Sequence, residues 1–259
     1  MYKFLPVDHH AWNLDCLLRS LDIQNSRYQW SHICNWLHMA SSIESVTLIT
    51  EKFDSSLDFC SSARAYEKSR SAMLSQLAVK LSTFNFIWGA FESLIETLEP
   101  LIPGCNINKF GKINTARYIL RKTSVKTING YRASLDMLLN LYNATVRDCV
   151  DHANIKFNEK GIFIVYKIRN KFAHGAYDLP QIPNEPEDLQ VSDIPLIDIS
   201  STIVLLTMQM LLNSYFKNQN IYLTELFLFN EFYDEESIPL IPLLRSIHLE
   251  DYVEIIMHS

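Results

Sequence analysis

Apolar residues recur at steps of three and four over most of the chain, which places them on one face of an α-helix. The longest such run covers 71–98, where eight apolar side chains form a heptad-like seam that ends before Pro100. Weaker helical patterns cover 11–23, 29–40 and 131–151. Residues 200–216 are apolar almost all round, which predicts a helix at the centre of the protein. The pattern therefore predicts an all-α fold.

The segments between these patterns divide the chain. Residues 41–62 are rich in Ser and Thr and predict an irregular connection or a short strand around 46–50. Four prolines between 179 and 195 predict a surface loop. The aromatic and acidic tail at 221–259 predicts a packed appendage with room for two short helices. We expect an N-terminal helical extension at 1–70, a helical bundle at 71–217 and an acidic C-terminal appendage at 218–259.

A further amphipathic helix is expected after a turn at 158–161. Ile164, Ile168 and Phe172 repeat every four residues and would hold one side of this helix against a core. Gly175 is the residue type that ends helices, and a proline follows at Pro180. The helix is therefore expected to end close to Gly175.

Three polar residues lie near this helix end. Arg169 and Asn170 are adjacent, and His174 follows Asn170 by four residues, so Asn170 and His174 would share one helix face. Arg can grip phosphate oxygens, and His can transfer a proton near neutral pH. This set of groups suits a phosphodiester substrate. The alternative is that Arg169 and His174 merely cap the end of a core helix.

The pattern R-N-x-x-x-H followed by Gly resembles the signature of the HEPN superfamily, whose members are helical bundles. Many HEPN proteins are metal-independent ribonucleases of toxin–antitoxin and anti-phage defence systems. The resemblance implies an HEPN-like bundle that cleaves RNA without a metal or cofactor. Arg169 would hold the scissile phosphate, His174 would transfer protons around the 2′-hydroxyl, and Asn170 would position one of them.

The resemblance also implies partners. HEPN ribonucleases commonly build one composite site from two subunits, so we expect a homodimer, with an antitoxin or defence-system protein as a further candidate partner. Members silenced by adenylylation have a Tyr two residues after the His. Here Ala176 holds that place and Tyr177 comes one residue later, which weakens the case for this control and leaves Tyr177 as a candidate supporting residue.

Charge is divided unevenly along the chain, whose net charge is −6. Residues 100–177 hold 13 Lys and Arg against 4 Asp and Glu, whereas residues 178–259 hold 2 against 14. A basic block that includes aromatic residues suits RNA, although an uneven surface of a soluble helix is the plainer alternative. The predicted RNA-binding residues are Lys109, Lys112, Arg117, Arg121, Lys122, Lys126, Arg132 and Lys171.

A polar stripe that includes Asn85 and Glu92 follows the 71–98 seam at the same spacing. These two side chains are expected either to form the solvated side of that helix or to face Arg169 and orient it.

Other features indicate the class of protein. The apolar stretch at 203–216 is short and interrupted by polar residues, so we expect no membrane span and a cytoplasmic protein. Five cysteines lie far apart and are expected to be buried thiols in a reducing compartment. His32, Cys34 and His38 match no usual zinc spacing, so no metal site is expected.

The sequence thus favours a metal-independent endoribonuclease. The second hypothesis is a non-catalytic HEPN-like module that binds nucleic acid or a protein through the same cleft. A third is a structural helical protein that uses the heptad-like seam for assembly.

Overall fold

The computed structural model describes residues 2–24, 29–54, 59–122, 128–145, 154–175, 193–223 and 237–257. The helices are α1 (Val7–Gln24), α2 (Ser31–Ser42), α3 (Ser61–Leu98), the 3₁₀ turn η2 (Glu99–Leu101), α4 (Ile107–Phe110), α5 (Lys112–Lys122), α6 (Tyr131–Thr145), α7 (Phe157–Ala173), α8 (Asp193–Phe216), α9 (Leu240–Ser246) and α10 (Tyr252–Met257). Over these residues, extended pairing is limited to the short antiparallel strands β1 (Tyr222–Leu223) and β2 (Ile238–Pro239) and one isolated bridge. The predicted all-α class is confirmed.

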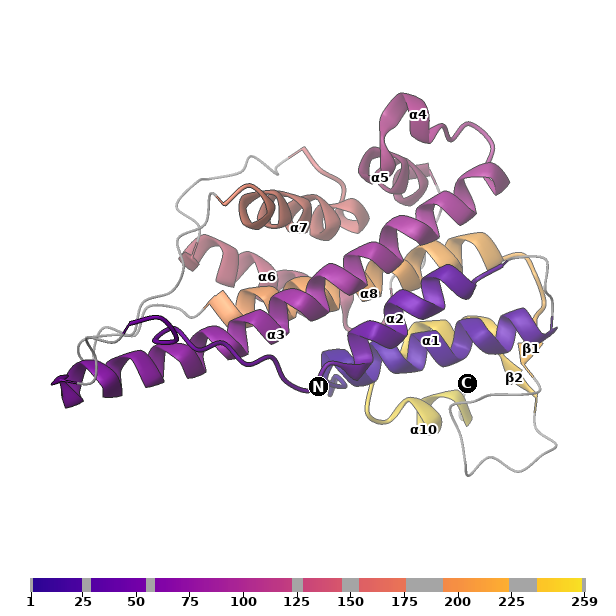
Figure 1. Cartoon of the computed structure of the whole chain (residues 1–259). Coiled ribbons are helices and arrows are strands. Elements are labelled where there is room, and N and C mark those ends of the chain that lie inside the picture. Colours follow the sequence, from indigo (N-terminus) through magenta and orange to yellow (C-terminus); the bar gives the residue numbers. More distant parts are fainter. Residues whose placement is uncertain are drawn as a thin grey trace.

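Helix α8 lies at the centre of the bundle. It contacts α1, α3, α5, α6, α7 and α9, and apolar side chains around its whole circumference are buried. Figure 1 shows α1 and α2 on one side of the α3–α8 pair, and α5, α6 and α7 on the other. The all-round apolar pattern predicted this central position, because such a helix is stable only when neighbours cover every face.

By length and composition, α8 could cross a membrane, since it has 24 residues and an apolar window of mean hydropathy 1.6. The helix begins at Asp193, before the start predicted at residue 200. Pro195 does not prevent this, because it lies in the first turn, where proline is tolerated. However, 78% of the apolar window is buried against the rest of the protein. The burial of this window matches that of a core helix.

Helix α3 is the longest helix in the described part of the chain, and its seam packs as predicted. Leu77, Phe84 and Phe91 are buried, as are Ile95 and Leu98. The helix begins ten residues before the expected start, at Ser61 rather than 71. Residues 61–70 carry no apolar face, but they include Ala, Arg, Glu and Lys, which favour helix without burial. Periodicity alone therefore missed this first part.

The connection before α3 has no strand at 46–50, so the irregular alternative is correct there. Its backbone is held by hydroxyl groups of α3. The N–H of Leu48 donates to Ser75 Oγ, and the N–H of Thr50 donates to Ser71 Oγ, each at 2.9 Å. Side chains of α3 thus satisfy backbone groups that a strand partner would otherwise satisfy.

One hydrophobic core runs through all three predicted segments of the chain. It includes Leu14 of α1, Leu205 of α8 and Leu243 of α9. The predicted boundary between 70 and 71 falls inside α3. The tail carries the two short helices expected there, α9 and α10, together with β2.

The thiols differ from the prediction. Cys16 and Cys34 are buried, but Cys105 is only partly buried and Cys60 is exposed; Cys149 lies outside the described residues. Cys60 directly precedes α3 and is exposed among the described residues. The usual tendency of cysteine to be buried therefore does not hold for Cys60.

A buried polar network joins the two ends of the chain to α8. Gln209 accepts a hydrogen bond from His10 Nε2 at 2.8 Å and donates to the carbonyl of Leu244 at 2.7 Å and to His248 Nδ1 at 3.1 Å. His248 Nε2 donates in turn to the carbonyl of Asn129 at 2.8 Å. His10, Gln209 and His248 are all buried, so each polar group depends on these partners.

Burial strongly disfavours charge on both imidazoles. Desolvation, followed by the proximity of His248, lowers the pKa of His10 well below its ordinary value. Desolvation lowers the pKa of His248 to about 4, against the smaller opposing effect of its hydrogen bond to Asn129. Both residues are therefore neutral in the folded protein at pH 7.

Candidate functional site

Helix α7 carries the R-N-x-x-x-H pattern, and its start corrects one prediction. Residues 158–161 are not a turn but the first part of α7, which begins at Phe157. Gly161 is buried where a Cβ atom would lie 2.7 Å from the hydroxyl of Tyr131 and 2.9 Å from Ile203. The glycine that suggested a turn is needed instead because α7 packs closely on α6 and α8.

The predicted apolar stripe holds α7 in place. Ile164 and Ile168 are fully buried, and Phe172 is partly buried against the same core. In the last turns Lys167, Ala173 and His174 are exposed, whereas Arg169 and Asn170 are partly buried.

The helix ends as predicted. His174 follows the last helical residue, and its N–H still donates to the carbonyl of Asn170 at 3.0 Å. Gly175 adopts a φ of +63°, a left-handed conformation that favours glycine at helix ends. The His174 side chain is exposed, one turn after Asn170.

Arg169 lies over an aromatic ring of α3. Its guanidinium carbon is 5.9 Å from the ring centroid of Trp88, a distance typical of a cation–π contact. Tyr166, one turn earlier in α7, stacks on the same indole with an interplanar angle of 16°. The structure shows no carboxylate paired with Arg169 in the described part of the chain. Among the described residues, its guanidinium is therefore held by the indole of Trp88 and not by an ion pair.

Trp88 is itself oriented by Glu92, to which its Nε1–H donates at 2.7 Å. Glu92 also accepts from Lys112 of α5 at 3.2 Å, and Lys112 lies 2.7 Å from Glu96. Burial lowers the pKa of Lys112, but the bonds to Glu96 and Glu92 outweigh it, so the pKa lies above its ordinary value. Glu92 is thus linked to Arg169 through the indole of Trp88, and it also pairs with Lys112.

Two arginines of the predicted RNA-binding set form ion pairs with one buried carboxylate of α7. Arg117 Nε lies 2.8 Å from Glu159 Oε2, and Arg121 Nη2 is at 2.8 Å from the same oxygen. Burial raises the pKa of Glu159, but the bond from Arg121 and the charge of Arg117 outweigh it, so the pKa lies below its ordinary value. These arginines join α5 to α7, and Glu159 balances one of their two positive charges.

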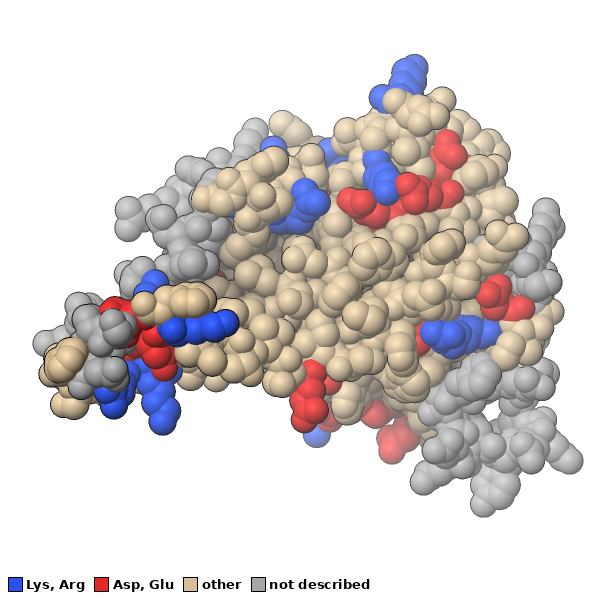
Figure 2. Space-filling model, viewed as in Figure 1, with Lys and Arg blue, Asp and Glu red and all other residues tan. Residues whose placement is uncertain are grey.

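The remaining predicted side chains are dispersed. Lys109 lies over Phe110, Lys122 over Tyr118, and Arg132 over Phe157. Lys171 is partly buried and Asn85 is exposed. Lys126 and Tyr177 lie outside the described residues. Figure 2 shows acidic and basic side chains intermixed over α3 and α5, with a broad uncharged area across the centre of this face. This face does not carry a continuous basic surface.

Three residues had no assigned role in the sequence pattern: Trp88 and Tyr166, which lie beside Arg169, and Glu159, which pairs with two arginines at the other end of α7. Trp88 was assigned only to the core seam, although a tryptophan four residues before a Glu can donate to it within one helix. Glu159 is the sole acidic residue between Asp151 and Asp178, and a lone acid in a basic segment was a signal for an ion pair.

Chemically, the end of α7 presents a positioned guanidinium, a neighbouring amide and an exposed imidazole. Arg169 Nη1 is 3.5 Å from Asn170 Oδ1, at the limit of a hydrogen bond. These groups can bind an anion and transfer a proton. No protein-family profile matches the chain, and comparisons with curated proteins and with solved structures find no match.

Proposed function

We propose that the protein is a metal-independent endoribonuclease with Arg169, Asn170 and His174 at its active site. The observation that carries this proposal is their shared position at the open end of α7, with the Arg169 guanidinium held over Trp88 and not paired with a described carboxylate. The resemblance to the HEPN signature supports the same assignment. We place the activity in cytoplasmic anti-phage defence or toxin–antitoxin growth control, with an antitoxin or defence-system protein as partner.

The proposed reaction uses the RNA's own 2′-hydroxyl. Its oxygen attacks the adjacent phosphorus while a base, His174, takes the hydroxyl proton. The bond from phosphorus to the 5′-oxygen breaks, and that oxygen gains a proton. Arg169 stabilises charge on the non-bridging oxygens, Asn170 positions the reacting groups, and Lys171 adds positive charge nearby. The products are a 2′,3′-cyclic phosphate and a 5′-hydroxyl.

RNA cleavage by the purified protein should therefore persist in excess EDTA and leave 2′,3′-cyclic phosphate ends. Treating the products with a cyclic phosphodiesterase and analysing them by mass spectrometry would identify these ends. Cleavage that appears only after addition of a divalent cation, or that leaves 5′-phosphates, would contradict the proposed reaction.

Arg169, Asn170 and His174 are few groups for phosphodiester cleavage, so we propose that two subunits contribute to one composite site. A two-fold axis brings identical surfaces together and would supply a second Arg and His. Mixing wild-type chains with excess His174→Ala chains, and allowing exchange, should then depress activity below the wild-type fraction. Activity strictly proportional to that fraction would show that each subunit works alone.

The second candidate is a non-catalytic module that binds nucleic acid or a protein through the same end of α7. The pairing of Lys112, Arg117 and Arg121 with carboxylates favours a protein as the ligand of such a module, since fewer cations remain for an RNA backbone. Absence of RNA cleavage by the folded protein, both in EDTA and after addition of divalent cations, would select this candidate over the ribonuclease.

A further inference from the structure

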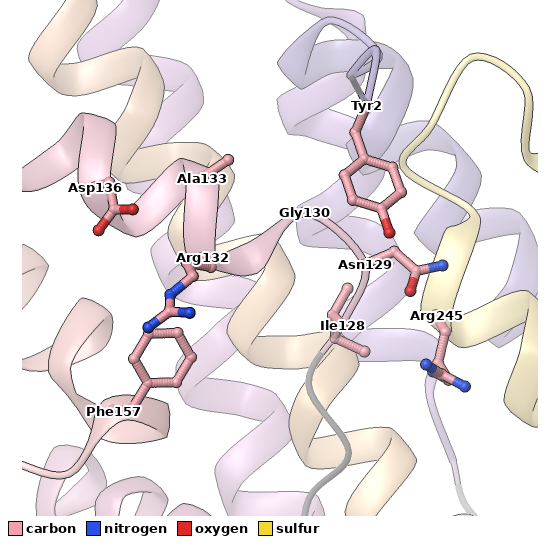
Figure 3. Close-up of a pocket in the computed structure, with 9 residues that line it drawn as sticks. All are labelled: Tyr2, Ile128, Asn129, Gly130, Arg132, Ala133, Asp136, Phe157 and Arg245. Atoms are coloured by element: carbon pink, nitrogen blue, oxygen red, sulfur yellow. The ribbon is translucent and has the colours of Figure 1, made fainter.

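An open cavity of about 680 Å³ lies at the opposite end of α7 from the proposed active site. The start of α6, the start of α7, the N-terminal segment and α9 surround it. It is lined by Tyr2, Ile128, Asn129, Gly130, Arg132, Ala133, Asp136, Phe157 and Arg245 (Figure 3). Its volume is within the range of pockets that hold small-molecule ligands.

Two guanidinium groups give the cavity its positive character. Arg132 lies over the ring of Phe157, with its guanidinium carbon 5.6 Å from the ring centroid. Arg245 Nε is buried and has no hydrogen-bond partner among the described residues. Neither arginine forms an ion pair with a described carboxylate, in contrast to Arg117 and Arg121. A buried donor without a partner is costly unless a ligand or water satisfies it.

The other lining groups narrow the chemistry of a ligand. Figure 3 shows the hydroxyl of Tyr2 pointing in the direction of Asn129, beside Arg245, while Arg132 and Phe157 lie together on the other side of Ile128. The rings of Tyr2 and Phe157 are 50% and 37% exposed, so both offer surface for a planar group. Asp136 adds one acceptor and limits the net positive charge, which disfavours a polyphosphate.

We infer that this cavity binds a small phosphomonoester that carries a planar ring, such as a nucleoside monophosphate. The phosphate lies against Arg245, with the donors of Asn129 and Tyr2 beside it, and the rest of the ligand extends past Ile128 toward Arg132 and Phe157. The ring stacks on Tyr2 or Phe157, and Asp136 accepts from a hydroxyl or amino group of the ligand.

This binding site is separate from the proposed active site. At 1.5 Å per residue, the twelve residues from Phe157 to Arg169 span about 18 Å of α7. The inference therefore does not depend on the proposed ribonuclease activity, and the two can fail independently.

Titration of the whole chain with adenosine 5′-monophosphate, followed by calorimetry, tests the inference. We expect saturable binding that Arg245→Gln weakens about tenfold or more, as expected for loss of a hydrogen bond to a charged group. Arg132→Gln should also weaken binding, because it removes the guanidinium beside Phe157 at the other side of the cavity. Adenosine and inorganic phosphate should each bind at least about tenfold more weakly than the monophosphate, because each lacks half of the contacts.

Control variants test whether the loss of binding is specific to the arginines of the cavity. Arg64→Gln removes an exposed guanidinium of α3, and Arg169→Gln removes the one at the other end of α7; both should retain binding. Should an arginine variant fail to fold, as judged by thermal melting, the exposed Tyr2→Ala substitution should still weaken binding. The inference is overturned by absence of monophosphate binding at millimolar concentration, by equal binding in the cavity variants, or by loss of binding in Arg169→Gln alone.

Discussion

Replacing His174 by Ala is expected to lower the rate of RNA cleavage by about 10²- to 10⁴-fold, the usual contribution of a general acid–base group. The fold should be unaffected, because the side chain is exposed and follows the end of α7. The rate is measured under single-turnover conditions in EDTA, and thermal melting verifies the fold. His32→Ala, which removes an exposed histidine of α2, is the matched control and should cleave at the wild-type rate.

Arg169→Ala should have an effect of similar size, about 10²- to 10³-fold, because the guanidinium stabilises charge that develops on the phosphate. The loss of its contact with Trp88 costs about 0.5–1 kcal/mol of stability, too little to unfold a domain. Arg169→Lys keeps the charge but not the planar fork and should be intermediate. Lys167→Ala, on the same helix, controls for general loss of charge. Wild-type cleavage rates in both the His174 and Arg169 variants would remove these residues from the active site.

The second large effect is expected on stability in mild acid, through the network of His10, Gln209 and His248. Both imidazoles have folded-state pKa values below the ordinary value of 6.5, and that of His248 is about 4. The unfolded chain therefore binds more protons between pH 6.5 and 4, and stability falls as pH decreases through this window. His248 alone accounts for about 3 kcal/mol at pH 4 relative to pH 7, and His10 adds to it.

The contacts explain the size of this effect. A proton on His248 Nδ1 would face the donating amide of Gln209, and its charge would stand beside His10, whose ring centroid is 5.4 Å away. The structure shows no carboxylate bonded to either ring within the described residues. Two carboxyl groups also make stability depend on pH in mild acid. The pKa of Glu159 is lowered, so its contribution to stability is lost as pH falls. Burial raises the pKa of Asp15, so protonation of Asp15 favours the folded state as pH falls.

Urea unfolding at pH 7, 6 and 5 measures the effect, with the free energy of unfolding as the readout. His10→Gln with His248→Gln should lower stability at pH 7, because the hydrogen bonds change, but should flatten its decline toward pH 5. His32→Gln should retain the wild-type slope. A free energy of unfolding that is equal at pH 7 and pH 5 in the wild type would refute the assignment of the network.

The helices were predictable where burial imposes a period on the sequence. The seam of α3 and the all-round apolar pattern of α8 both exceed what chance spacing produces, and the structure confirms both. The start of α7 was not predictable in this way, because Gly161 has the same appearance in a turn and in a close helix contact. Only the neighbours Tyr131 and Ile203, remote in sequence, distinguish the two.

The residue types of the candidate site and their place at one helix end could be predicted from the sequence. The side chains that surround them could not. The spacing of Asn170, His174 and Gly175 is local and follows from helix geometry. The indole beneath Arg169 and the carboxylate between Arg117 and Arg121 come from other helices. A count of cations in the sequence therefore overestimated the free positive charge, since tertiary pairing cannot be inferred from composition.

The hydrogen bonds of Gln209 also bear on the order in which the protein is built. Its partners lie 199 residues earlier and 39 residues later, at His10 and His248. During synthesis at the ribosome, α1 and α8 can meet before residue 248 has been added, but the amide of Gln209 then lacks its last acceptor in an apolar interior. Helix α1 can therefore pack on α8 early, but the polar network of this core is completed only after Leu244 and His248 have also been added.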